Sequence, residues 1–216
     1  MNDCCQLPQH QDRQMRLRYV CSAAILLVLG IAWIFEAQAQ SSDSPRYAPN
    51  GDLLVPTGFE TWVFVGSNLG LAYNQEARDT ASPGVTRAAA PTRFHNVYIN
   101  NAAYSRFRAT GEFPDPTVLV MQVFSAADKE PRGVLSKGVF EGERTGFSVA
   151  VKNASRPDGS KTVWAYYSFT DQSDPSKVRA AASALPDQAC ESCHRQHASK
   201  DNVWVQFYPT LRDLLK

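Results

Sequence analysis

Alternating apolar and polar residues predict a β-sheet as the main element of this chain. Strands are predicted at Glu60–Gly66, Phe94–Ile99 and Thr117–Phe124, which are rich in β-branched and aromatic residues. Two more are predicted at Gly146–Val151 and Thr162–Phe169, on either side of a Pro-Asp-Gly turn signal. Because turns or one short helix separate successive strands, the pattern predicts an antiparallel sheet. The expected fold class is therefore α+β, mainly antiparallel β-sheet with a few flanking helices.

Helical and loop signals fill the gaps between these strands. A short helix is predicted over 100–110, with an asparagine cap at its start and Gly111 at its end. The alanine-rich segment Pro175–Leu185 predicts a second helix. A long loop is expected over Asn68–Pro91 and a polar turn over Ser125–Gly133.

The beginning of the chain has the pattern of a secretory signal. Three arginines precede the apolar run Tyr19–Phe35, and Ala37-Gln38-Ala39 follows it. Cleavage after Ala39 is the favoured interpretation. The alternative is an uncleaved membrane anchor, for which this apolar run is short. Both interpretations place the rest of the chain across the inner membrane, and we expect a periplasmic protein.

The pattern divides the chain into three parts. Residues 1–39 are the expected signal peptide, 40–52 an extended N-terminal tail, and 53–216 a single domain. The segment Asn202–Arg212 is too aromatic for a free end, so we expect it to pack on the domain. The chain has 22 Lys and Arg against 21 Asp and Glu, and it has no basic cluster. This balance argues against nucleic acid as a partner.

A Cys-x-x-Cys-His motif stands near the C-terminus, at residues 190–194. The thiols of Cys190 and Cys193 can each form a thioether with one haem vinyl group, and His194 is then placed to ligate the iron. The motif predicts one covalently attached haem c. A structural disulfide or a metal site remains an alternative, although zinc would need ligands that the sequence supplies poorly. The other three cysteines lie in the expected signal peptide, which suits an oxidising compartment.

The strands, the export signal and this motif together give the chain a resemblance to a known family. The sequence resembles the cytochrome P-460 family, and more distantly the beta-type cytochromes c′. The resemblance covers almost the whole exported part and rests on Asn50–Pro56, Glu60–Gly66, Val97–Ile99 with Tyr104, Thr110–Phe113, Cys190–His194 and Phe207–Arg212. It implies a largely β monohaem fold, usually a homodimer, with an open sixth position on the iron. The namesake members oxidise hydroxylamine, and also handle nitric oxide, with a haem cross-linked to a lysine.

Three positions depart from the family pattern. The family's cross-linking lysine corresponds to Met121, so the resemblance implies that the cross-link is absent here. Met121 is then a candidate cofactor-binding residue, either as an apolar wall of the haem pocket or as a thioether ligand. The pocket arginine of the family corresponds to His95 and its proton-relaying acid to Ser148. His95 is a candidate catalytic residue that donates to the ligand or relays a proton, and Ser148 is a weaker candidate that acts through water.

Other chemically suggestive residues have simpler interpretations. His197 lies three residues after the expected iron ligand and is interpreted as a surface residue. Trp62, Trp164 and Trp204 are assigned to core packing. Arg195 either meets a haem propionate or is solvated.

These observations lead to one functional hypothesis and two rivals. The leading hypothesis is an exported monohaem c-type cytochrome whose largely five-coordinate haem, ligated by His194, binds and weakly oxidises nitric oxide or hydroxylamine. The rivals are a non-enzymatic gas-binding or sensing protein and a six-coordinate electron carrier with Met121 or His95 as sixth ligand. Expected partners are a small gaseous or nitrogenous ligand, a redox protein and a second copy of the chain. A membrane is a partner only if the signal stays uncleaved.

Overall fold

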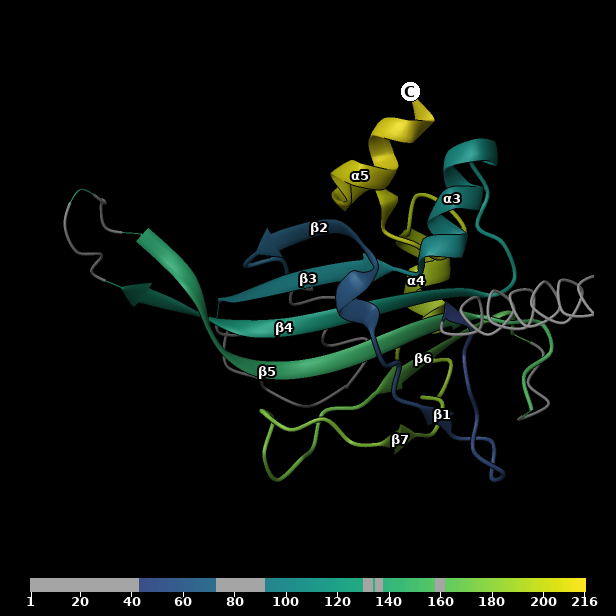
Figure 1. Cartoon of the computed structure of the whole chain (residues 1–216), viewed down its shortest axis with the longest axis horizontal. Coiled ribbons are helices and arrows are strands. Elements are labelled where there is room, and N and C mark those ends of the chain that lie inside the picture. Colours follow the sequence, from purple (N-terminus) through teal and green to yellow (C-terminus); the bar gives the residue numbers. More distant parts are fainter. Residues whose placement is uncertain (1–42, 73–91, 130–133, 135–137, 158–161) are drawn as a thin grey trace, which may run out of the picture. The chain divides into compact units, whose positions relative to one another are not determined.

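A five-stranded antiparallel sheet forms the centre of the domain (Figure 1). The structure is a computed structural model that describes residues 43–72, 92–129, 134, 138–157 and 162–216. The strands lie in the order β2-β3-β4-β5-β6, and they are β2 (Val63–Leu69), β3 (Arg93–Ile99), β4 (Thr117–Lys129), β5 (Gly138–Lys152) and β6 (Trp164–Ser168). A separate two-stranded sheet pairs β1 (Leu53–Leu54) with β7 (Ala181–Ala182). The expected α+β class with a mainly antiparallel sheet is confirmed.

Each predicted strand corresponds to a strand of the sheet, but several ends differ. The strand predicted at Glu60–Gly66 begins only at Val63, because Phe59–Thr61 form a 3-10 helix, η2. The turn predicted at Ser125–Gly133 is wrong over its first part, since β4 continues to Lys129 and pairs with an early extension of β5. This end of the hairpin projects beyond the other strands (Figure 1), so polar residues there do not interrupt the pairing.

The first predicted helix is confirmed as α3 (Asn101–Thr110). Gly111 ends it in the left-handed conformation, with φ of 72°. Asn100 precedes the helix, but its side chain does not cap it. Its Oδ1 accepts from the Val118 N–H at 2.9 Å and its Nδ2 donates to the Asp43 carbonyl at 3.2 Å, so it ties the tail to the sheet.

In the described part of the chain, the remaining helical elements lie near the C-terminus and are short. They are α4 (Glu191–His197), η3 (Val205–Phe207), α5 (Pro209–Arg212) and η4 (Asp213–Leu215). Within the described residues, no helix has the length and apolar character needed to cross a membrane.

The helix predicted at Pro175–Leu185 is wrong. Part of this segment forms β7, and the Leu185 N–H donates to the Tyr166 carbonyl of β6 at 2.8 Å. The alanine run favours a helix by its intrinsic propensity. Pairing with β1 and β6 satisfies the backbone instead and buries Ala182, so tertiary contacts override that propensity.

Strand alternation sends side chains into two cores, one on each face of the sheet. The face on which the Cys-x-x-Cys-His segment packs is called the motif face, and its core includes Val97, Ile99, Leu119, Trp164 and Tyr166. The opposite face includes Val118, Val120, Phe147, Val149 and Tyr167. The expected packing of the C-terminal segment is confirmed by the burial of Val203, Val205, Tyr208 and Leu211 on the motif face.

Parts of three predictions lie outside the described residues. They are the signal peptide with the start of the tail, within 1–42, most of the long loop, within 73–91, and the Asp-Gly part of the Pro-Asp-Gly turn, within 158–161. The division of the chain at residues 39 and 52 also stays a prediction.

Candidate functional site

The thiols and the imidazole of the motif gather at the start of α4. Cys190 immediately precedes this helix, and Cys193 and His194 lie within it. Both thiols are free and half-buried. Burial raises the pKa of the Cys190 thiol, and the neighbouring Cys193 raises it further. Cys190 is therefore an S–H group at neutral pH, available for bond formation.

The His194 ring is held at both nitrogens. Its Nδ1 lies 2.8 Å from the Asn202 carbonyl oxygen, which can only accept, so Nδ1 carries the proton and Nε2 keeps its lone pair. Burial lowers the pKa of His194, so the ring is neutral at pH 7. The Tyr166 ring packs beside it with a centroid separation of 4.5 Å. A neutral imidazole with Nδ1–H bound to a backbone carbonyl is the usual state of a metal-ligating histidine.

Trp204 contacts the free nitrogen of this ring. Its Nε1–H donates to His194 Nε2 at 3.1 Å, and the two rings meet edge to face. The assignment of Trp204 to core packing was therefore incomplete, since this half-buried indole is also a polar partner of His194. No spacing pattern in the sequence predicts this contact.

Glu191 is a second residue that sequence reasoning did not single out. It is buried inside the motif, with 5% of its surface exposed. Its carboxylate accepts from Arg195 at 2.5 Å and from Asn202 Nδ2 at 3.2 Å. Arg195 therefore pairs with the motif itself, and the i,i+4 spacing of the two residues is the signal that predicts this pair.

The three positions that depart from the family pattern all lie on the motif face. Met121 on β4 stands directly opposite Val97 on β3 and Ser148 on β5. His95 lies two residues before Val97 on β3, on the same face, and stands opposite Val123 on β4. Met121 packs against the same core cluster as Cys190. The fold thus brings Met121, Ser148 and His95 to one side of the sheet, the side that carries the Cys-x-x-Cys-His motif.

His95 has an unused polar atom. Its Nδ1 is buried and has no hydrogen-bond partner, and the same holds for Oδ1 of Asn68, its cross-strand neighbour on β2. Burial, followed by the nearby charge of Arg93, lowers the pKa of His95. A neutral imidazole next to an amide can offer a donor and an acceptor to a small polar molecule. Asn68 was missed because its pairing with His95 depends on a strand register that the sequence does not reveal.

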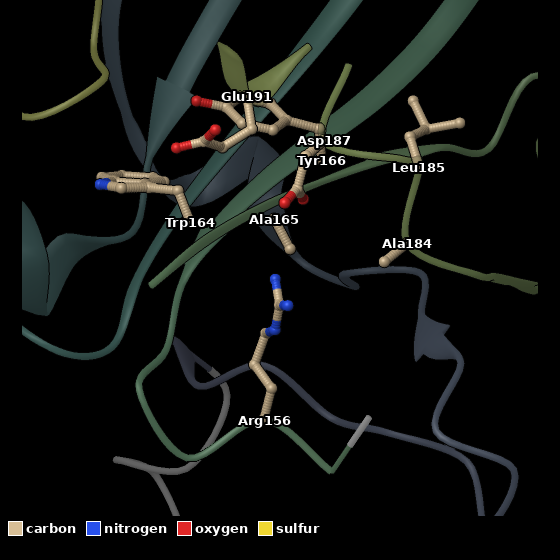
Figure 2. Close-up of a pocket in the computed structure, with 8 residues that line it drawn as sticks. All are labelled: Arg156, Trp164, Ala165, Tyr166, Ala184, Leu185, Asp187 and Glu191. Atoms are coloured by element: carbon tan, nitrogen blue, oxygen red, sulfur yellow. The ribbon is translucent and has the colours of Figure 1, made fainter. Parts of the chain in front are cut away.

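A small pocket lies beside the motif at the edge strand β6 (Figure 2). Its volume is about 80 Å³, which suits a few waters rather than a haem. Arg156 reaches toward it from the side opposite Glu191 (Figure 2). The residues that line it are Arg156, Trp164, Ala165, Tyr166, Ala184, Leu185, Asp187 and Glu191.

The side chains of the motif face fit a covalently held haem. Cys190 and Cys193 supply two thiols, and His194 supplies a neutral, oriented imidazole. Tyr166 and Met121 supply apolar surface nearby. One contact must change, since iron can bind His194 Nε2 only when the Trp204 N–H releases it. Among the described residues, no group of three or more His, Cys, Asp and Glu side chains could hold a bare metal ion.

The comparisons with known proteins give one match. The family model of cytochrome P-460 matches residues 56–205, which include the motif and the three departing positions. No curated protein matches the chain.

Proposed function

Because the chain belongs to the cytochrome P-460 family and is thus a haem-binding cytochrome, we propose that it binds small nitrogen ligands at a single haem c ligated by His194. The ligands in question are nitric oxide and hydroxylamine. The observation that carries the proposal is the state of His194, whose Nδ1–H is bound by the Asn202 carbonyl while Nε2 keeps its lone pair beside two free thiols. When bound, a haem supplies an iron that takes up small ligands and exchanges electrons.

Attachment through Cys190 and Cys193 is the first part of this proposal. Each thiol would add across one vinyl group, with the sulfur bonding one vinyl carbon and the S–H hydrogen ending on the other carbon as the π bond is lost. Their half-buried position next to His194 supports this role, because sulfur and imidazole then approach the same group. No oxidant or reductant is consumed.

The opposite side of the ligand site is proposed to involve Met121, His95 and Ser148. Met121 stands between Val97 and Ser148 of the neighbouring strands, and this position supports a role as an apolar wall of the haem pocket rather than as an iron ligand. The unpartnered Nδ1 of His95 supports a donor or acceptor toward a bound ligand. Ser148 can contribute only a hydroxyl, and a side chain amine is missing at Met121. We therefore expect ligand binding without a haem cross-link and with weak hydroxylamine oxidation.

Export and partners complete the proposal. The arginines, apolar run and Ala37-Gln38-Ala39 site support transfer to the periplasm, and the two remaining cysteines are those of the motif. There the protein would form a homodimer and exchange electrons with a redox protein. Measuring the mass of the mature protein tests cleavage after Ala39, and its sedimentation tests the dimer.

Substitutions in α4 test haem ligation directly. His194→Ala is expected to abolish the histidine-ligated haem spectrum, and Cys190→Ser with Cys193→Ser to abolish covalent attachment, as seen by haem staining of the denatured chain. His197→Ala is the matched control, because His197 lies on the same helix but is exposed. Equal loss in His197→Ala, or a normal spectrum in His194→Ala, would refute the assignment.

A non-enzymatic gas-binding protein is the second candidate. The replacement of a lysine and an acid by Met121 and Ser148 favours it, since a thioether cannot form the cross-link and a serine hydroxyl does not ionise as a carboxyl group does. Spectra of the ferric and ferrous protein, with and without nitric oxide, separate the candidates. Tight nitric oxide binding with no consumption of hydroxylamine favours the gas-binding protein. A six-coordinate spectrum that does not change when nitric oxide is added would instead support an electron carrier with Met121 or His95 as the sixth iron ligand.

A further inference from the structure

The turn that follows α4 has an unusual backbone. Asp201 and Asn202 both adopt positive φ, 43° and 61°, and the Val203 N–H closes the turn on the Lys200 carbonyl at 2.8 Å. Two consecutive left-handed residues correspond to a type I′ turn. Side chains with a Cβ disfavour this conformation, although Asp and Asn tolerate it better than most. Such a turn persists when its surroundings hold it in place.

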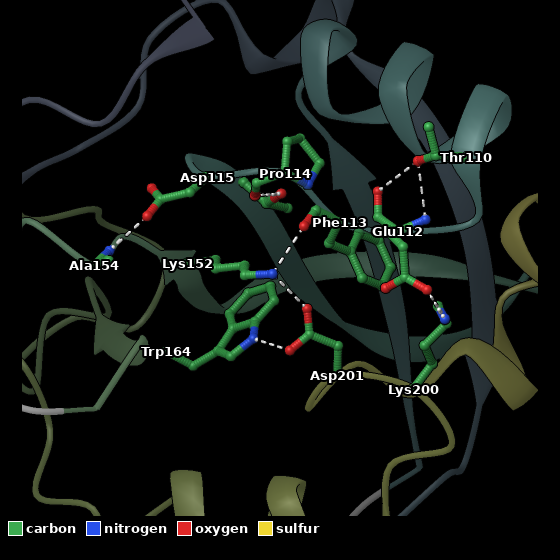
Figure 3. Close-up of polar contacts among 11 residues, drawn as sticks. Thr110, Glu112, Phe113, Pro114, Asp115, Lys152, Ala154, Trp164, Lys200 and Asp201 are labelled. Atoms are coloured by element: carbon green, nitrogen blue, oxygen red, sulfur yellow. Dashed lines mark hydrogen bonds and ion pairs between the residues drawn. The ribbon is translucent and has the colours of Figure 1, made fainter.

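Two strands of the sheet hold this turn through Asp201 (Figure 3). One carboxylate oxygen accepts from Lys152 Nζ at 2.8 Å, and the other accepts from Trp164 Nε1 at 3.0 Å. Lys152 and Trp164 are direct cross-strand partners on β5 and β6. Lys152 also donates to the Phe113 carbonyl at 2.8 Å, and Trp164 is buried. We call Asp201, Lys152 and Trp164 the Asp201 network.

The next residue of the turn faces the motif. The Asn202 carbonyl accepts from His194 Nδ1 at 2.8 Å, and the Tyr166 hydroxyl approaches the same oxygen at 3.4 Å. The Asn202 side chain donates to Glu191 Oε1 at 3.2 Å. The direction of this carbonyl depends on the φ and ψ angles of the turn. The Asp201 network therefore controls where the acceptor for His194 lies.

We propose that Asp201 is a positioning residue that sets the hydrogen bond between the Asn202 carbonyl and His194, and through it the electron density that His194 gives to the haem iron. The inference rests on the proposed function of His194 as iron ligand. A well-aligned carbonyl acceptor polarises the Nδ1–H bond and makes Nε2 a stronger donor. A stronger donor stabilises ferric over ferrous iron, so an intact Asp201 network lowers the reduction potential of the haem.

The test compares holoprotein variants by two readouts that are independent of turnover. Asp201→Ala removes both contacts of the network, whereas Asp201→Asn keeps an oxygen for Trp164 and loses the charge that pairs with Lys152. The readouts are the midpoint potential and the iron–histidine stretching vibration of the ferrous protein. Glu112→Gln is the matched control, because Glu112 holds the neighbouring Lys200 at 2.8 Å (Figure 3) without touching Asp201.

For Asp201→Ala we expect the ratio of oxidised to reduced haem at a fixed potential to fall about tenfold, which is a rise of about 59 mV in the midpoint potential for one electron. The iron–histidine vibration is expected to move to lower frequency. Asp201→Asn should show a smaller change in the same direction, and it keeps the test usable if Asp201→Ala does not fold. Glu112→Gln should match the wild type in both readouts.

Three results would overturn the inference. A lower melting temperature with unchanged potential and vibration in Asp201→Ala and Asp201→Asn would show a merely structural role. An equal shift in Glu112→Gln would show that the effect is not specific to the network. If the wild type has no iron–histidine vibration, or His194→Ala keeps it, the proposed function fails as well. That last result is distinguishable because it is seen without any substitution at Asp201.

Discussion

The contact between Trp204 and His194 makes a prediction that depends on whether haem is bound. Trp204→Phe removes the indole N–H and leaves His194 Nε2 without its partner at 3.1 Å. An unpaired buried acceptor costs about 1–3 kcal/mol. The smaller ring also loses apolar burial worth about 1 kcal/mol, since Trp204 is only half-buried. In the apoprotein both losses apply, so we expect destabilisation by about 2–4 kcal/mol.

The haem-loaded protein should respond less to the same substitution. His194 Nε2 would then ligate the iron and no longer accept from the Trp204 N–H, so only the loss of about 1 kcal/mol from burial would remain. Urea unfolding followed by circular dichroism measures both forms, with the apoprotein prepared as the Cys190→Ser, Cys193→Ser variant. Trp62→Phe is the control, because Trp62 is buried in the core of the opposite face and should cost the same in both forms.

Two outcomes would refute this reasoning. If Trp204→Phe destabilises the apoprotein and the haem-loaded protein equally, the indole does not contact the ligating nitrogen. If Trp62→Phe shows the same dependence on haem, the difference reflects global stability rather than the contact with His194. Either result would also remove the requirement that Trp204 release His194 before iron binds.

Three further predictions concern the sheet. Met121→Lys is expected to give a red-shifted haem absorption through a new cross-link. Gln122→Lys should not, because strand alternation places Gln122 on the opposite face. An unchanged spectrum in Met121→Lys would show that this position does not face the haem. Asn100→Ala should cost about 1–3 kcal/mol in urea unfolding, because the Val118 N–H loses its acceptor, and a loss below about 0.5 kcal/mol would contradict that role. Because burial lowers the pKa of His95 below 6.5, the unfolded chain binds more protons there, and stability should fall as pH drops below about 6.5. His95→Gln should reduce this slope in unfolding measured between about pH 5 and 7, and an unchanged slope would assign it to other groups.

The sequence predicted the sheet because its signal is local. The alternation of apolar and polar residues in Phe94–Ile99 and Thr117–Phe124 indicates which side chains face a core. Both segments form strands in the structure. The same logic failed for the alanine-rich segment that ends at Leu185, where intrinsic propensity indicated a helix. Its backbone partners lie on β1 and β6, and local sequence carries no information about them.

The candidate site divides in the same way. Cys190, Cys193 and His194 lie within five consecutive residues, so their spacing alone predicts their chemistry. The acceptor for His194 is a backbone carbonyl, which has no residue-type signature. Its neighbour Asp201 belongs to an Asp-Asn pair that signals a turn, but the contacts of that turn with β5 and β6 depend on how the chain folds back.

The long sequence separation of the Asp201 network has a consequence for the order of folding. Asp201 lies 49 residues after Lys152 and 37 after Trp164, so these contacts close long loops and form only once β5 and β6 have paired. A chain that has not yet folded would present its two thiols on a flexible segment, with no rigid acceptor behind His194. The thioether bonds to the cofactor could then form first. The hydrogen bond that strengthens the bond between His194 and iron would form later, after β5 and β6 have paired.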